Sequence, residues 1–169
     1  NDPKLCLEAD GLVVPGVGAF AACMSQLISV GGDEIIRERV ENSKPIFGIC
    51  VGMQILFDSS SEKTQTSGLG IFSGEVTQIK SQILPHMGWN TVKAAENSQL
   101  FDGIESETFY FVHSYAAKKP IPGALNSLTN YGEDFIASVE RDFIVATQFH
   151  PEKSGSAGAT LIKNWVAAL

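Results

Sequence analysis

Apolar residues in the first third of the chain gather in short runs and at helical spacing, separated by glycine and proline. Residues 12–14 and 45–49 are apolar runs with the length of buried strands. Two helical segments lie between them; the first ends at Gly31-Gly32, and the second begins near Asp33, which can cap it. This order of elements predicts a parallel strand–helix–strand unit with a right-handed crossover. The helices are predicted from the spacing of Met24, Leu27, Ile28, Ile35, Ile36 and Val40.

The rest of the chain alternates short apolar runs with polar turns. Residues 58–67 are polar and predict a loop, whereas 108–114 predict a strongly aromatic strand that ends near His113. A hairpin is predicted around Arg141-Asp142. These elements together predict a single α/β domain without internal repeats or a linker. The other predicted elements are strands at 75–79, 90–93, 125–129, 135–140 and 143–147 and a closing helix at 158–169.

Composition narrows the class of protein. With 169 residues, 44% of them hydrophobic, the chain can bury a core of its own. Its net charge of −7 argues against nucleic acid as the main partner, and its apolar runs are too short to span a bilayer. No signal peptide is visible. Cys6, Cys23 and Cys50 stand at no metal-ligand spacing, which predicts no metal site and a reducing, cytoplasmic location.

The first candidate for chemistry is Cys50, which stands between Gly48 and Gly52 where the second strand meets the start of a helix near Val51. A nucleophile placed on a sharp strand-to-helix turn needs small neighbours, because the turn leaves no room for flanking Cβ atoms. The partial positive charge of a helix N-terminus would favour a thiolate. The alternative is that Cys50 is a small buried residue between packing glycines.

The second candidate is the segment 148–154, which follows an apolar strand. A histidine at a strand end, here His150, can act as a general base toward a thiol, and a carboxylate such as that of Glu152 can hold its tautomer. Pro151 stiffens the link between the two side chains. The alternative is a surface loop with ordinary charges.

Taken together, the motifs resemble those of a known enzyme family. The segments 48–54 (GICVGMQ) and 148–155 (QFHPEKSG) are similar to the class-I glutamine amidotransferases, which use a Cys–His–Glu triad. Three more segments resemble the glutaminase subunits of imidazole glycerol phosphate synthase, which serve histidine biosynthesis. These are 15–20 (PGVGAF), 84–90 (LPHMGWN) and 109–115 (FYFVHSY). The resemblance runs from about Gly11 to the C-terminus, with the motifs in the family's order.

The resemblance implies a fold and a reaction. The fold is α/β and flavodoxin-like, with a mixed, mostly parallel central sheet and helices on both faces. The reaction is hydrolysis of L-glutamine to glutamate and ammonia, with Cys50 as nucleophile, His150 as base and Glu152 as its orienting partner. No cofactor and no metal are implied.

The resemblance also implies binding groups around the triad. The backbone N–H of Val51 is one oxyanion donor, and the 15–18 loop, at Val17 and Gly18, supplies a second after a peptide rearrangement. The glutamine pocket is implied to comprise Gly16, Gln54, His113, Ser114 and Tyr115. For the last three residues, the alternative is that the aromatic segment is a core strand with a polar end.

A partner follows from the resemblance as well. It is a cyclase with a (β/α)₈ barrel, which receives the ammonia and produces imidazole glycerol phosphate and aminoimidazole carboxamide ribotide. Trp89 and Lys153 are candidates for the interface, and His86 and Met87 are weaker ones. No nucleic-acid or membrane partner is expected. The free glutaminase is expected to be nearly inactive.

Two other functions stay open from the sequence. One is the glutaminase of another class-I amidotransferase, such as pyridoxal phosphate synthase, against which the PHMGWN segment argues. The other is a non-catalytic binding or redox-sensing module in which Cys50 is oxidised, against which the retention of His150 and Glu152 argues.

The start of the chain departs from the family pattern. Family members open with a strand and a helix before the region that matches Leu12, and the domain at 1–169 is expected to lack that unit. In a doubly wound sheet such a strand would lie centrally, so its loss would expose ladder groups and apolar surface. Poor solubility or poor activity is therefore expected for these residues alone.

Overall fold

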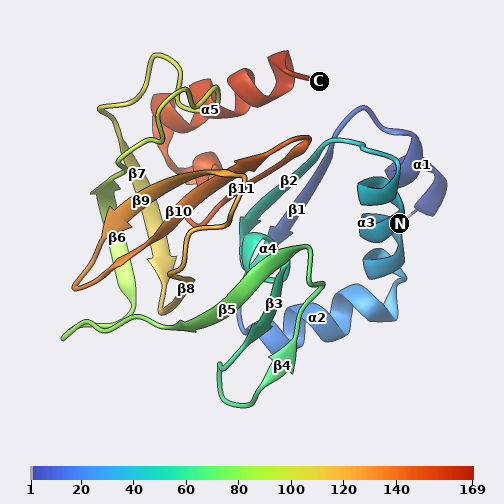
Figure 1. Ribbon diagram of the computed structural model, residues 1–169, viewed down its shortest axis with the longest axis horizontal. Coiled ribbons are helices and arrows are strands. Elements are labelled where there is room, and N and C mark those ends of the chain that lie inside the picture. The colour runs from blue at the N-terminus through green and yellow to red at the C-terminus, as the bar shows by residue number, and fades with distance from the viewer. Residues whose placement is uncertain (1) are drawn as a thin grey trace.

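The computed structural model describes residues 2–169, which form an α/β fold with three sheets (Figure 1). The helices are α1 (Pro3–Glu8), α2 (Phe20–Ser29), α3 (Gly32–Glu41), α4 (Val51–Gln54) and α5 (Gly155–Ala167), with a 3-10 turn at Pro151–Lys153. The strands are β1 (Leu12–Gly16), β2 (Ile46–Cys50), β3 (Phe57–Ser60), β4 (Thr66–Ser67), β5 (Phe72–Gln78), β6 (His86–Thr91), β7 (Thr108–His113), β8 (Tyr115–Ala117), β9 (Leu125–Asn130), β10 (Asp134–Arg141) and β11 (Ile144–Thr147).

The largest sheet has five strands in the order β1-β2-β11-β10-β9. The strands β1, β2 and β11 run parallel, while β10 pairs antiparallel with β11 and with β9. The prediction of a mixed α/β sheet is confirmed, and so is the hairpin at Arg141-Asp142, which joins β10 to β11. Because β1, β2 and β11 are parallel, their carboxyl ends meet at one edge, where Gly16, Cys50 and Thr147 lie.

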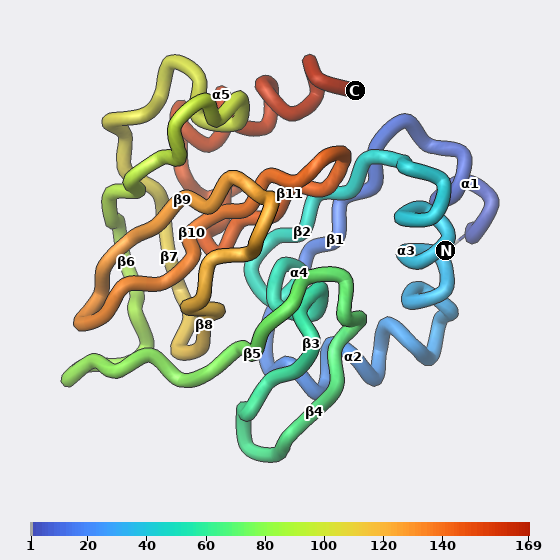
Figure 2. The backbone as a smooth tube through the Cα atoms, in the orientation of Figure 1, coloured from blue at the N-terminus to red at the C-terminus, as the bar shows by residue number. Residues whose placement is uncertain are grey.

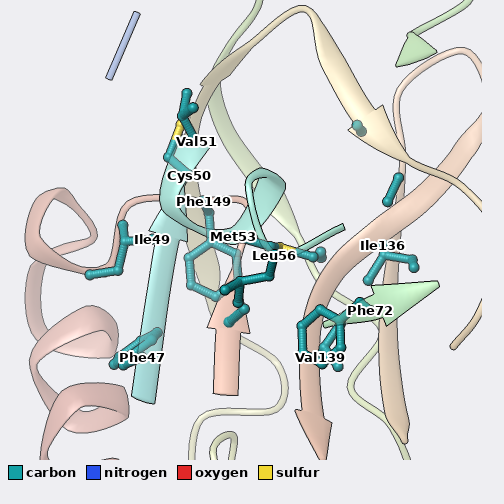
Figure 3. Packing of buried hydrophobic residues seen from close by; sticks show 14 of the residues in the cluster. Phe47, Ile49, Cys50, Val51, Met53, Leu56, Phe72, Ile136, Val139 and Phe149 are labelled. Carbon is teal, nitrogen blue, oxygen red and sulfur yellow. The ribbon is translucent and has the colours of Figure 1, made fainter. Parts of the chain in front are cut away.

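Helices cover both faces of β2, as predicted. Phe47 packs against Trp165 of α5, with ring centroids 5.2 Å apart. Successive residues of a strand face opposite sides of the sheet, so the Cα of Gly48 faces the other side, where α4 packs closely against it. Burial on both faces leaves all five residues of β2 buried, and Figure 3 shows Phe47, Ile49 and Cys50 following one another along this strand.

Two smaller sheets complete the fold. The first has the order β4-β3-β5-β8, and the second is the β6–β7 hairpin. The prediction of a loop over 58–67 is wrong in part, since β3 and β4 lie there. Their polar residues pair through the backbone, with β3 parallel to β5, and Asp58 accepts a hydrogen bond from the Gly74 amide at 2.8 Å. Tertiary pairing thus overrides the weak strand propensity of this segment.

Several local predictions are corrected. Asp33 lies in the first turn of α3, and the cap is Gly31 in a left-handed conformation, φ 68°. Ile28 of α2 is exposed, whereas its spacing predicts a place on the buried face with Met24. The helix after Cys50 is only the single turn α4, shorter than the apolar run predicts.

The N-terminal segment is held by one buried arginine. Arg39 of α3 is fully buried, and its guanidinium donates to the carbonyl oxygens of Cys6 at 2.8 Å, Ala9 at 2.9 Å and Pro45 at 2.7 Å. A buried cation of this kind is tolerable because both terminal guanidinium nitrogens donate hydrogen bonds, whereas Nε has no partner within residues 2–169. The short helix α1 is thereby fastened to α3, beside which it lies in Figure 2.

Among the described residues, β1 has β2 as its one neighbour and is an edge strand. Val13 on this strand is 44% exposed. The expectation that the domain lacks a strand–helix unit stays a prediction. No helix in residues 2–169 has the length and apolarity that a membrane crossing requires.

Candidate active site

Cys50 occupies a strained turn at the end of β2. Its backbone angles are φ 57° and ψ −113°, a conformation that side chains rarely adopt. Three glycines make the turn possible. A Cβ on Gly52 would come within 1.8 Å of the Val14 carbonyl oxygen, and one on Gly16 within 2.6 Å of the Gly52 amide. A Cβ on Gly48 would stand 2.8 Å from the Gly52 carbonyl oxygen, so the predicted need for small neighbours is confirmed.

The environment of the Cys50 thiol opposes ionisation. Burial raises its pKa to about 12, and the hydrogen bond from the Val51 amide lowers it only in part. The predicted field of a helix N-terminus acts in the expected direction, but α4 is a single turn and burial dominates. At neutral pH the resting side chain is therefore a thiol, and a base is needed to take its proton.

His150 and Glu152 form such a base. The imidazole Nδ1 lies 2.6 Å from Glu152 Oε1, and since a carboxylate only accepts, Nδ1 carries the proton. In the neutral ring, Nε2 is then the acceptor. Nε2 is buried and has no hydrogen-bond partner within residues 2–169. The 3-10 turn begun by Pro151 brings the two side chains together, as predicted.

Cys50 and His150, one hundred residues apart in the chain, line the same cavity of about 430 Å³. Parallel pairing explains the meeting: β2 and β11 end side by side, so the residues after them face one another. The lining residues are Val17, Gly18, Cys50, Val51, Gln54, Glu62, Val112, His113, Ser114, Tyr115, His150 and Lys153.

Most of the predicted pocket residues are brought together here. Gln54, His113, Ser114 and Tyr115 all line the cavity. Gly16 does not; it pairs with Cys50 across the sheet and packs against α4. Ser114 separates β7 from β8, and this break turns the chain across the cavity wall.

Two amide side chains join the cavity floor to the nucleophile. Gln54 donates to the Tyr115 carbonyl oxygen at 2.9 Å and to the Gln148 amide oxygen at 3.0 Å. Gln148 in turn points its amide nitrogen at Cys50 Sγ, 3.7 Å away. Sequence reasoning missed Gln148, although strand alternation places it on the same side of the chain as His150.

The 15–18 loop forms another wall. Val17 is 73% exposed and Gly18 has φ 90°, and both line the cavity. The Val17 carbonyl oxygen accepts a hydrogen bond from Cys23 Sγ at 3.2 Å. Glu62, which sequence reasoning also missed, accepts from the Phe20 amide at 2.7 Å and places a carboxylate at the cavity.

The predicted interface residues differ in their exposure. Met87 and Trp89 are 61% and 57% exposed, as an interface requires. Lys153 is exposed and lines the cavity mouth. His86, in contrast, is 3% exposed, so it is wrong as a contact residue. Within residues 2–169, no group of three or more His, Cys, Asp or Glu side chains is arranged to hold a metal ion.

Comparison with known proteins agrees with this geometry. Residues 3–169 match the family model for glutamine amidotransferase class-I. A relative from Corynebacterium diphtheriae is 49% identical over 179 residues, covering 100% of this chain and 85% of its own length. One from Mycobacterium tuberculosis strain CDC 1551 is 51% identical over 172 residues, covering 99% and 84%. Each bears the name imidazole glycerol phosphate synthase subunit HisH.

Solved structures resemble the fold at lower identity. A crystal structure of a glutamine amidotransferase is 19% identical, with a TM-score of 0.70, covering 93% of this chain and 79% of that one. A crystal structure of a putative GMP synthase protein from Thermoplasma acidophilum is 24% identical, with a TM-score of 0.70, covering 98% and 75%. These likenesses bear on the fold alone.

Proposed function

This chain belongs to the class-I glutamine amidotransferases, and within them to the family of the imidazole glycerol phosphate synthase subunits HisH; from that premise we propose that it hydrolyses L-glutamine to L-glutamate and ammonia. The observation that carries the mechanism is the buried Nε2 of His150, an acceptor without a partner in the described chain, at the cavity that also holds Cys50. We assign Cys50, His150 and Glu152 as the triad.

In the first half of the reaction, Cys50 Sγ attacks the side-chain amide carbon of glutamine as its proton passes to His150 Nε2. Glu152 stabilises the imidazolium that results, because its carboxylate lies 2.6 Å from Nδ1. His150 then returns the proton to the leaving nitrogen, ammonia departs, and a thioester remains on Cys50.

In the second half, water attacks the thioester carbon while His150 Nε2 takes one of its protons. The carbon–sulfur bond breaks, glutamate leaves, and the proton returns to Cys50. Over the full cycle one amide bond is hydrolysed by one water molecule. A positioned acid–base of this kind contributes roughly 10² to 10⁴ in rate.

The oxyanion formed in both halves needs two donors. The amide of Val51, which already bonds to Cys50, is the first. The loop at Val17 and Gly18 provides the second, and its open backbone at Gly18, where an added Cβ would meet nothing within 4 Å, lets a peptide turn. The free chain is accordingly expected to be weakly active until this loop changes.

The charged groups at the cavity fit the ends of the amino-acid substrate. Glu62 supplies an anion for the α-ammonium group, and Lys153 supplies a cation near the mouth. Gln54, His113, Ser114 and Tyr115 line the space between them and bind the body of glutamine.

The ammonia passes to a partner protein, a cyclase with a (β/α)₈ barrel that makes imidazole glycerol phosphate and aminoimidazole carboxamide ribotide. The relatives' name, which describes them as subunits, supports a partner. Its contact surface comprises Met87 and Trp89, two exposed apolar side chains on β6, together with Lys153. The complex is expected in the cytoplasm.

The test measures glutamate and ammonia release by the chain together with the cyclase and its nucleotide ligand. The wild type should turn over glutamine, and Cys50→Ala should lose all turnover. Cys6→Ala is the matched control, since Cys6 lies on α1 outside the cavity, and it should keep wild-type activity. Glutamine hydrolysis by Cys50→Ala would overturn the assignment.

The same assay separates the alternatives. A redox-sensing module would show no glutamine turnover with any partner, while Cys50 would still oxidise reversibly. A glutaminase for another synthase would be activated by that synthase instead of the cyclase. The family relationship favours the cyclase.

A further inference from the structure

A line of polar side chains, half-buried at Asn90 and buried at His86 and His113, connects β6 to the cavity wall. Asn90 Nδ2 lies 3.3 Å from His86 Nε2, and His86 Nδ1 lies 3.1 Å from His113 Nε2. His113 Nδ1 lies 2.9 Å from the carbonyl oxygen of Tyr115. His86 and His113 are 3% and 7% exposed, and the mechanism above gives no role to His86.

The hydrogens in this line can be placed from its two ends. The Tyr115 carbonyl oxygen only accepts, so His113 Nδ1 carries a proton and donates. In a neutral ring Nε2 of His113 is then an acceptor, and His86 Nδ1 must donate to it. His86 Nε2 accepts from the Asn90 amide, which is a donor. Burial lowers the pKa of His86 to about 4 and that of His113 to about 3, so both rings are neutral at pH 7.

The far end of the line is a pocket wall. The Tyr115 carbonyl oxygen accepts from His113 and also from Gln54 Nε2 at 2.9 Å. These two donors hold the turn at Ser114 against the cavity. His86 cannot move freely, since it stacks between Tyr131, with centroids 4.0 Å apart, and Phe111, 4.7 Å apart.

The other end of the line, at Asn90 and His86, lies on β6, the strand that also carries the exposed apolar residues Met87 and Trp89. Along β6, exposure alternates, with His86 buried and Met87 and Trp89 exposed. One rigid strand, paired with β7 over its whole length, therefore presents His86 inward and the contact residues outward. A change in the position of β6 reaches the pocket through His86.

We propose that His86 is a positioning residue for glutamine binding, which acts through His113 on the Tyr115 carbonyl and so couples the position of β6 to the pocket. The inference rests on the proposed glutaminase function. His86 touches no reacting atom, so its loss should weaken substrate binding and leave the chemical step nearly unchanged.

The first test needs no activity. In the wild-type protein with ¹⁵N-labelled histidine, NMR at pH 7 should show both His86 and His113 as neutral rings protonated on Nδ1, the less common tautomer in solution. A proton on Nε2 of either ring, or a charged ring, would overturn the proposal, because the line of donors would then be broken.

The second test uses the complex with the cyclase. His86→Phe keeps a stacked ring without a donor and should raise KM for glutamine about tenfold, the effect of one lost hydrogen bond, with kcat within about threefold. His86→Asn restores a donor near the Nδ1 position and should recover most of the affinity. Tyr131→Phe, which keeps the stack on His86, should match the wild type.

The outcomes are separable. If the wild-type complex hydrolyses no glutamine, the proposed function fails and the NMR result alone decides the hydrogen-bond line. If the wild type is active and His86→Phe changes kcat with KM unchanged, the positioning role is wrong. If His86→Phe does not fold, the same KM comparison is made with His86→Leu, which also lacks the donor, and an unchanged KM in that variant would reject the proposal.

Discussion

The two walls of the cavity are built in different ways. On one wall the elbow of β2 and α4 places Cys50 by backbone contact alone, with Gly16, Gly48 and Gly52 allowing approaches that no side chain could fit. On the other wall, β6, β7 and β8 place the pocket residues through hydrogen bonds and stacked rings, among them His86 and His113. The two walls come from different sheets: β2 lies in the five-stranded sheet, β6 and β7 form a sheet of their own, and β8 lies in the four-stranded sheet.

The difference concerns tolerance to change. Backbone packing at the elbow admits no substitution, because atoms already touch and neither main chain can retreat. When one residue of a hydrogen-bonded wall is replaced, the wall loses the free energy of about one hydrogen bond but keeps its shape. Changes at the elbow should therefore abolish the fold or the reaction, while changes in the histidine line should alter affinity and pH response.

The most severe change on either wall should be Gly52→Ala. The added Cβ would meet the Val14 carbonyl oxygen at 1.8 Å, so we expect loss of cooperative folding or destabilisation above about 4 kcal/mol by urea denaturation. Gly103→Ala is the control, because its Cβ would meet nothing within 4 Å and its φ of 74° costs only about 1 to 2 kcal/mol. Equal stabilities of the two variants would show that the elbow can relax.

The thiol at the elbow should react slowly. A Cys50 pKa near 12 leaves about 10³-fold less thiolate at pH 8 than an ordinary thiol with a pKa of 9.0. In a Cys6→Ser/Cys23→Ser variant, alkylation by iodoacetamide should be slower than that of N-acetylcysteine by at least this factor. The rate should rise in the complex, where the 15–18 loop is expected to rearrange. A free-chain rate equal to that of the small thiol would mean that the helix N-terminus outweighs burial after all.

Acid should weaken the histidine-lined wall. In the unfolded chain both histidines titrate near pH 6.5, but in the folded protein their pKa values are lowered to about 4 and about 3. Below pH 6.5 the unfolded state binds more protons, so stability falls as pH falls toward 4, by on the order of 3 kcal/mol per histidine.

The measurement for this acid effect is the free energy of urea unfolding between pH 7 and 4. A His86→Phe/His113→Asn variant should show a flatter dependence, since it lacks both buried histidines whose pKa values are lowered. If wild type and variant lose stability in parallel, the two histidines do not carry the effect.

The mildest of these changes concerns Glu152. Its carboxylate holds the His150 tautomer but is 47% exposed, so solvent already screens part of the charge. Glu152→Gln should lower kcat for glutamine by about 10- to 100-fold and leave KM within a few-fold. A loss as large as that of Cys50→Ala would place Glu152 in direct contact with the chemistry.

Several features could be read from local patterns. The glycine spacing around Cys50 predicted the elbow, and the His–Pro–Glu order predicted the paired base, because both depend on neighbours within a few residues. The aromatic strand before His113 and the hairpin at Arg141-Asp142 were predicted for the same reason. Local patterns failed where pairing with a distant segment determines the secondary structure, as in the strands found over 58–67.

The missed site residues follow the same division. Strand alternation could have identified Gln148, two residues before His150 and 3.7 Å from the nucleophile. Glu62 offered no signal, since its place at the cavity comes from the β3–β4 turn and its bond to the Phe20 amide. His86 was taken for a weak interface candidate because it stands in one short segment with Met87 and Trp89, and only the alternation of exposure along β6 shows that it is buried.

Residue types at short spacing were sufficient to establish the α/β class, the nucleophile elbow and the family. The folded arrangement was needed to establish that Cys50 rests as a thiol, that His150 reaches the same cavity and that a histidine line supports the far wall. The physical reason is that burial and the meeting of separate strands depend on packing across the whole chain, which no local pattern records.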